Sequence, residues 1–269
     1  MSRFYWQSET RKELKRHHFD LRVRSREKMM LAPVKTFLRE QASRVIDQML
    51  RFPSPTAMAG MQFSIRDEAQ RFHDALSKYY WKIADLGFHA GIAASKGELE
   101  SGKATPGYVK PKVVTPANEA ALRKMIVYSG TKQAETTMNE VHDALRIAEE
   151  EMWTVEGVTQ YVAAKLGQET IWKARRIART ETAKTENWAE LEGYKDTEFV
   201  EYKGWICAYV ELSREAHKIA DQEYGSNPIP LDDDFVVMGE PLDHPGDPQG
   251  SPENIINCLC TMFPAIKNL

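Results

Sequence analysis

The sequence predicts an α+β fold: an extended helical N-terminal region followed by a compact α+β C-terminal domain with a small sheet. Apolar residues recur at helical spacing through the first half, and the sequence texture changes at Trp153. The run FVEYKGWICAYV at residues 199–210 is rich in β-branched and aromatic residues, which is typical of a strand, and FVVM at 235–238 is a second candidate. We therefore predict a helical region over residues 1–150 and an α+β domain over residues 151–269.

Proline, capping and glycine signals divide the N-terminal region. An apolar stripe predicts a helix over residues 36–50, and Pro53 ends it because proline lacks an amide hydrogen and clashes with the preceding turn. Ser64 begins a capping-box pattern that opens the next helix, and Gly87 is a natural left-handed end for that helix. Residues 100–116 are rich in Gly and Pro, which indicates a connector.

Further helices are predicted on both sides of the boundary. Thr115 can cap the helix that follows the connector, because its hydroxyl can accept a bond from a free amide of the first turn. A short helix is expected over residues 154–166 and a longer one over residues 168–191, with Gly193 ending the longer one. Ser213 can cap a last short helix that runs through Tyr224.

Composition limits the class of protein. The chain has 269 residues, of which 42% are hydrophobic, and a mean hydropathy of −0.52. It contains no apolar run of about 18 residues that could span a bilayer, and its first residues do not resemble a signal peptide. Three cysteines are an odd number and give no disulfide framework. We expect a soluble protein without a membrane partner, made in a cytoplasm, whose cysteines are thiols or metal ligands.

The net charge of −3 hides an asymmetry along the chain. Residues 1–30 hold nine Lys or Arg against four Asp or Glu, a net +5, and residues 189–256 hold four against sixteen, a net −12. This pattern indicates either two different kinds of partner or two solvated surfaces. If the basic end contacts DNA phosphates, the candidate residues are Arg11, Lys12, Lys15, Arg16, Arg22 and Arg24.

The helix over residues 168–191 places one acid on its apolar face. Glu181 shares a helical stripe with Ala178 and Thr185, where a lone carboxylate is costly unless a cation accompanies it. Arg214 and His217 lie on one face of the predicted short helix and are the candidate partners. The alternative is that Glu181 lies at the solvated edge of a half-buried stripe and that Arg214 and His217 belong to a solvated face.

The C-terminal cysteines suggest a metal site. Cys258 and Cys260 are two residues apart, so both thiols point the same way in an extended segment and could supply half of a zinc site. His217 and His244 are the histidines of this half that could complete it, and the alternative is two buried or unligated thiols. We expect Cys207 to be a core residue. No Gly-rich phosphate loop, G-x-S-x-G elbow or H-E-x-x-H motif is present.

Taken together, residues 154–262 resemble the C-terminal domain of the phage Mu F-like minor head proteins. That family combines an I-A-R-T-E helix, a strand ending in Trp, an R-x-x-H helix and a Pro/Gly/Asp loop before N-C-R-C. The corresponding segments here are Ile177–Glu181, Lys203–Trp205, Arg214 with His217, Pro245–Pro248 and Asn257–Cys260. Leu259 stands where the family commonly has arginine.

The resemblance implies a phage minor head, or head-morphogenesis, protein rather than an enzyme. Such proteins associate with the portal, assist procapsid assembly and aid DNA packaging or ejection. The expected partners are the portal and capsid or scaffold proteins, with double-stranded DNA as a further one, and the expected location is the capsid interior or portal region of the virion, assembled in the host cytoplasm. A structural cluster of Glu181, Trp205, Arg214 and His217 would hold the domain together. The alternative is a metal-dependent nuclease or hydrolase with a Cys/His/Glu site.

Overall fold

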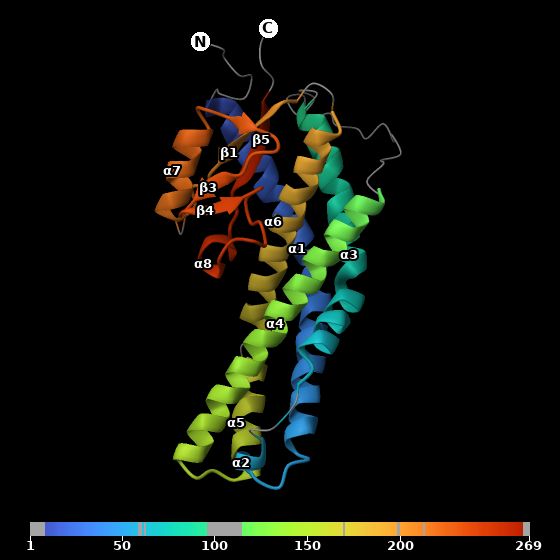
Figure 1. Ribbon diagram of the computed structural model, residues 1–269, viewed down its shortest axis with the longest axis vertical. Coiled ribbons are helices and arrows are strands. Elements are labelled where there is room, and N and C mark those ends of the chain that lie inside the picture. Colours follow the sequence, from blue (N-terminus) through green and yellow to red (C-terminus); the bar gives the residue numbers. More distant parts are fainter. Residues whose placement is uncertain are drawn as a thin grey trace. The chain divides into compact units, whose positions relative to one another are not determined.

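A computed structural model describes residues 9–58, 61, 63–95, 115–168, 170–197, 200–211 and 213–265. It confirms the predicted α+β class, with long helices first and a small antiparallel sheet near the C-terminus (Figure 1). The elements are α1 (Glu9–Met49), α2 (Pro55–Met58), α3 (Ile65–Ser95), α4 (Pro116–Glu150), α5 (Val155–Gln168), α6 (Thr170–Lys195), β1 (Tyr202–Ile206), α7 (Glu215–Tyr224), β2 (Ile229–Pro230), β3 (Phe235–Val237), β4 (Glu240–Leu242), α8 (Pro252–Ile255) and β5 (Thr261–Ala265). The predicted connector at residues 100–116 lies outside the described residues, apart from its last two.

The chain divides into two compact units, and the division differs from the predicted boundary near residue 150. Unit 1 comprises residues 1–28, 79–119 and 179–269, and unit 2 comprises residues 29–78 and 120–178. The two divisions differ because α1, α3 and α6 each contribute residues to both units. Sequence texture reports local secondary structure, whereas a compact unit is defined by contacts between distant segments.

Unit 2 is helical and has its own apolar core. Val45 and Met49 of α1 pack with the predicted stripe of α4, which includes Val141 and Leu145, and with Val158 of α5. The capping signals were predicted correctly in both units. In unit 2 the Ser64 hydroxyl accepts a bond from the Asp67 amide at 3.1 Å, and in unit 1 the Thr115 hydroxyl accepts one from the Asn118 amide at 3.1 Å.

Two glycines that were predicted to end helices lie inside them. Helix α3 continues past Gly87 to Ser95, and α6 continues past Gly193 to Lys195. In unit 1 these glycines bring the two helices together. A Cβ on Gly87 would lie 2.9 Å from the Ala189 Cβ, and a Cβ on Gly193 would lie 2.5 Å from the Phe88 carbonyl oxygen. Because glycine has no side chain, Gly87 and Gly193 allow α3 and α6 to pack closely.

The sheets of unit 1 are short. The first has the order β2-β1-β5 and is antiparallel, with Trp205 opposite Met262 and Ile206 opposite Thr261; the second pairs β3 with β4. Strands β1 and β3 were predicted from their β-branched and aromatic residues, whereas β2, β4 and β5 were not predicted. Trp205, Phe263 and Phe235 are buried in a core that lies between these strands and α7.

Helix α7 begins at Glu215 with Arg214 as its N-cap, so the predicted Ser213 cap is wrong. The Ser213 hydroxyl instead accepts a bond from the Val210 amide at 2.9 Å. Within the part of the chain that the structure describes, no helix combines the length and apolarity needed to cross a bilayer.

The α3–α6 packing yields a pair of substitutions with opposite signs. A Cβ on Gly91 would overlap the backbone carbonyl of Glu190, so Gly91→Ala should destabilise the chain by about 1–3 kcal/mol. The same change at Gly167 of α5, where a Cβ meets nothing within 4 Å, should be neutral or stabilising by up to about 1 kcal/mol. Urea unfolding followed by circular dichroism measures both. Equal effects would contradict the close packing.

Candidate functional site

The motif segments of unit 1 meet through hydrogen bonds. Thr180 of α6 accepts a bond from the Asn257 amide at 3.0 Å, which ties the I-A-R-T-E helix to the segment that carries two cysteines. Asn257 has a φ of 56°, a left-handed conformation that Asn tolerates better than most residues. Arg214 donates from Nη2 to the Ile256 carbonyl at 2.7 Å, so the N-terminus of α7 is tied to the same segment.

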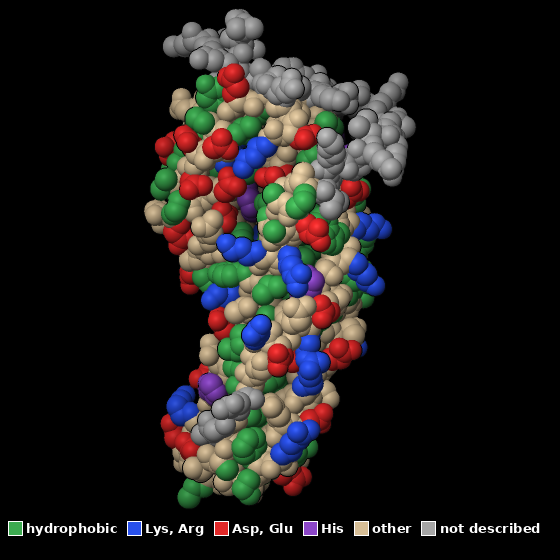
Figure 2. Space-filling view, turned by 45° about the vertical axis from the view of Figure 1, so that its right-hand side comes forward, with side chains coloured by type: hydrophobic (Ala, Val, Ile, Leu, Met, Phe, Trp, Pro, Cys, Tyr) green, Lys and Arg blue, Asp and Glu red, His purple; other side chains and the backbone are tan. Residues whose placement is uncertain are grey.

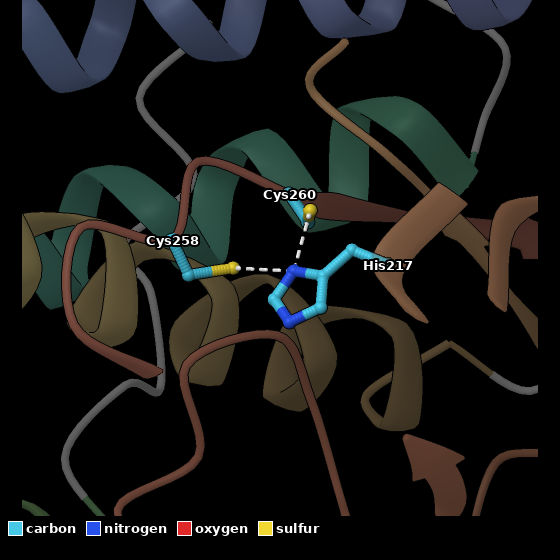
Figure 3. A group of neighbouring side chains, drawn as sticks. All are labelled: His217, Cys258 and Cys260. Carbon is cyan, nitrogen blue, oxygen red and sulfur yellow. Dashed lines mark hydrogen bonds between the residues drawn. The ribbon is translucent and has the colours of Figure 1, made fainter. Parts of the chain in front are cut away.

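His217 is the centre of this arrangement (Figure 3). Its Nδ1 lies 3.3 Å from the Cys260 sulfur and 3.6 Å from the Cys258 sulfur, and its Nε2 lies 2.8 Å from Oδ1 of Asn254. The indole of Trp205 meets the imidazole edge to face, with ring centroids 5.6 Å apart. The His217 ring is therefore held on three sides, and one nitrogen faces both thiols.

The cluster is removed from solvent. His217 is 2% exposed, Cys258 4% and Cys260 3%. A hydrogen bond from the Cys260 thiol and the neighbouring His217 hold the pKa of Cys258 well below its ordinary value, whereas burial raises the pKa of Cys260 well above its own. Burial is the largest influence on the pKa of His217 and would lower it, but the hydrogen bond to Cys258, the charge of Cys258 and the bond to Asn254 together outweigh burial, so the net direction is upward. Cys258 is thus the thiol of this pair that ionises more readily.

Cys207 belongs to this neighbourhood, which sequence analysis did not predict. It follows β1 directly and is fully buried. A hydrogen bond from the Cys260 thiol lowers its pKa to about 6. Its carbonyl accepts a bond from Nε of Arg16 at 2.8 Å, so α1 holds the end of β1. The pairing of β1 with β5 could have revealed this position, but β5 itself was not predicted.

His244, a predicted metal ligand, lies elsewhere. It is buried, but its Nδ1 lies 3.2 Å from the carbonyl oxygen of its neighbour Pro245. Among the described residues, the group whose ligand atoms all lie within 4.8 Å of one another is His217, Cys258 and Cys260. The structure thus brings together three of the four predicted ligands and excludes His244.

Glu181 is buried as predicted, but its expected partners were wrong. The cation beside it is Lys184, one turn further along α6, and its carboxylate accepts a bond from the Tyr80 hydroxyl at 2.6 Å. Arg214 and His217 are engaged with the cysteine-bearing segment and its neighbour Asn254 instead. Periodicity placed Glu181 on the inner face correctly, but it could not show that α3 supplies a hydroxyl there.

The strongest electrostatic feature of unit 1 is a set of ion pairs between α1 and α6. Nζ of Lys15 lies 2.7 Å from Oε2 of Glu190, and both side chains are fully buried. Arg22 bonds to both Glu186 and Glu190, and Arg26 pairs with Glu186. Two buried carboxylates are thereby matched by three cations. We call these five residues the charged core.

Burial and pairing act in opposite directions within the charged core. Burial would raise the pKa of Glu190, but Lys15 and Arg22 outweigh it and lower that pKa below its ordinary value. Burial dominates for Lys15 and lowers its pKa to about 8. It also raises the pKa of Tyr194, whose hydroxyl donates to Glu190 at 3.2 Å. Glu190 is therefore an anion held by two cations and one neutral donor.

The predicted DNA-contact residues are largely occupied within the chain. Lys12 is 7% exposed and lies 3.4 Å from Asp221, and Arg16 lies 3.8 Å from the same carboxylate. Lys15 and Arg22 are likewise paired with acids of unit 1, so the charges of these four cations are matched within the chain. Arg24 is exposed but pairs with Asp20, and Arg11 is partly buried.

Part of the charge asymmetry along the sequence is cancelled inside unit 1, because cations of α1 form ion pairs with acids of α6 and α7. The remaining acids lie at the surface, and acidic side chains gather over the C-terminal elements on the face drawn in Figure 2. Exposed acids of this region include Glu215, Glu223, Asp232, Asp233 and Asp234.

Comparison with known proteins identifies no relative. No protein-family model matches the chain, and no curated protein or solved structure matches it either.

Removing one cation from the charged core should be costly. Lys15→Met leaves the buried Glu190 short of a partner, so the free energy of unfolding should fall by about 3–5 kcal/mol. Arg24→Gln removes a cation from the same helix whose side chain is 68% exposed, and it should cost less than about 1 kcal/mol. Chemical denaturation of the two variants tests the difference. Similar small losses would show that Lys15 and Glu190 are solvated.

The lowered pKa of Glu190 predicts acid lability. The unfolded chain takes up this proton near the ordinary pKa of 4.5, above the folded value, so protonation favours unfolding. The contribution is complete above that pH and is lost as the pH falls. Glu190→Gln should therefore flatten the fall in stability between about pH 5 and pH 3. The exposed Glu253→Gln serves as the control and should keep the wild-type slope, measured by denaturation at each pH.

Proposed function

We propose that this chain is a phage minor head protein of the Mu F-like type, which works by association with the portal and with capsid or scaffold proteins during head assembly. The proposal starts from the order and spacing of the motif segments over residues 154–262. It places the protein in the virion, in the capsid interior or portal region. Its action is binding and assembly rather than turnover, in aid of DNA packaging or ejection.

The observation that carries the proposal is that the motif segments contact one another. Thr180 bonds to Asn257, Trp205 packs on His217, and His217 faces two cysteines. These residues are far apart in sequence, and chance matches to four short patterns would have no reason to form one cluster. Their convergence supports the interpretation that the pattern describes a single folded module.

The burial of these residues favours a structural role for the module. His217, Cys258 and Cys260 have the chemistry of a catalytic or metal site, yet each is at most 4% exposed. A hydrolytic site that used Glu181 together with the cysteines is not supported, because Glu181 is engaged with Lys184 and Tyr80. The module therefore has the features of a rigid element that presents its surface to partners.

Double-stranded DNA is not among the partners that we propose for the N-terminal helix. Neutralised cations release few counterions on binding, and counterion release supplies most of the affinity of non-specific DNA contacts. Lys12 and Lys15 are already paired within the chain. The partners that we propose are therefore proteins. The exposed acidic surface of unit 1 is complementary in charge to a basic surface on such a partner.

The test is whether the protein is part of the particle. The full chain is given an affinity tag and expressed in cells that produce the phage whose genome encodes it. Phage heads are then separated by gradient sedimentation. The tagged chain should sediment with procapsids, at far fewer copies than the major capsid protein. Heads that sediment normally while the chain remains at the top of the gradient would refute the proposal.

Two variants tie the result to the module. Trp205→Ala removes the fully buried indole that packs on His217 and should cost about 3–5 kcal/mol of stability, so this variant should be depleted from heads. Arg24→Gln, which changes an exposed residue, should sediment as the wild type does. Equal incorporation of both variants would show that assembly into heads does not depend on the packing of Trp205 in the motif cluster.

A further inference from the structure

The geometry of the histidine–cysteine cluster points to a property that the proposed assembly role does not require. We propose that the module holds one structural Zn²⁺, ligated by Nδ1 of His217 and by the sulfurs of Cys258, Cys260 and Cys207. The proposal is independent of the protein's role in phage assembly, since it rests only on the residues of this cluster.

The first argument is the distance between ligand atoms. Tetrahedral zinc with Zn–N of about 2.1 Å and Zn–S of about 2.3 Å places nitrogen and sulfur about 3.6 Å apart. Nδ1 of His217 lies 3.3 Å from the Cys260 sulfur and 3.6 Å from the Cys258 sulfur (Figure 3). All three ligand atoms lie within 4.8 Å of one another. The cluster therefore already has nearly the dimensions of one face of a zinc tetrahedron.

The second argument is the orientation of the imidazole. The Asn254 amide donates to the Val237 carbonyl at 2.9 Å and to Glu240 at 3.1 Å, which turns its Oδ1 toward His217. Nε2 of His217 must then carry the proton, and the lone pair of Nδ1 is directed at the two sulfurs. Zinc-bound histidines are held in this way by an acceptor on the far ring nitrogen. Asn254 is a positioning residue for the site.

The third argument identifies the fourth ligand. The β1–β5 ladder ends with Ile206 opposite Thr261, so one step further along both strands places Cys207 opposite Cys260. Residues that are directly opposite in an antiparallel pair have Cβ atoms about 5 Å apart. Cys207 is fully buried, and a hydrogen bond from the Cys260 thiol lowers its pKa. Its sulfur lies outside the group of ligand atoms that are all within 4.8 Å of one another, so Cys207 would have to move toward the other three residues to complete the site. Three thiols and one imidazole form a Cys₃His set, a common composition of closed structural zinc sites.

Such a site would connect three short elements of unit 1. It would join α7 through His217, the end of β1 through Cys207, and the segment before β5 through Cys258 and Cys260. Binding energy at a structural zinc site contributes directly to folding, because the unfolded chain holds no preformed site. A buried disulfide between Cys207 and Cys260 is the competing use of the same thiols.

Metal content of the full chain tests the proposal. Protein made in zinc-supplemented medium and purified without chelators should contain one zinc per chain by elemental analysis. The cysteine variants Cys258→Ser and Cys260→Ser should lose the metal, whereas His244→Gln, a buried histidine outside the cluster, should retain it. Zinc-free wild-type protein that also fails to take up added Zn²⁺ would overturn the proposal, as would a Cys207–Cys260 disulfide found by thiol titration of the freshly purified protein.

Cobalt substitution keeps the test informative if the cysteine variants do not fold. Wild-type protein loaded with Co²⁺ should show the visible absorption of a tetrahedral site and a sulfur-to-cobalt charge-transfer band. Cys207→Ser should weaken that band, and an unchanged spectrum would exclude Cys207 as a ligand. Asn254→Ala should lower the affinity for Zn²⁺ about 10- to 100-fold while the tetrahedral spectrum persists at saturation. Unchanged affinity would refute the positioning role of Asn254.

Discussion

The fold of unit 1 depends on the burial of two carboxylates, Glu186 and Glu190, inside a helix bundle. Charges this far from water are tolerated only when cations accompany them and hydrogen bonds satisfy their oxygens. Lys15, Arg22 and Arg26 supply these cations from a helix more than 150 residues earlier in the chain. Because an unpaired charge in this place would be strongly unfavourable, the pairing sets the register of α1 on α6.

This constraint makes the beginning of the chain part of the C-terminal module. The same face of α1 reaches beyond α6, where Lys12 pairs with Asp221 of α7 and Arg16 bonds to the carbonyl of Cys207. The absence of side chains at Gly91 and Gly193 also lets α3 approach α6 closely. Helix α6 is thus covered both by charge matching with α1 and by backbone contact with α3, and it is continuously buried from Thr180 to Asn187.

The histidine–cysteine cluster complements this scaffold among the short strands of unit 1. The strands of unit 1 are two to five residues long, and sheets this short gain little stability from their own hydrogen bonds. Trp205 and Phe235 belong to the apolar core of unit 1, and the contacts of His217 link that core to the segment before β5. A cross-link at this point, of the kind that small cores commonly use, would join the ends of elements that the charged core does not reach.

Local chemistry determined much of this protein from sequence alone. The Ser64 and Thr115 caps, the strand around Trp205 and the inward face of Glu181 could all be predicted, because each depends on residues within a few positions of one another. Tertiary structure decided the rest. Whether a glycine ends a helix or lets another helix approach depends on what packs against it, and which cation a carboxylate meets depends on segments 175 residues apart, as for Lys15 and Glu190. Periodicity carries no information about partners at that separation.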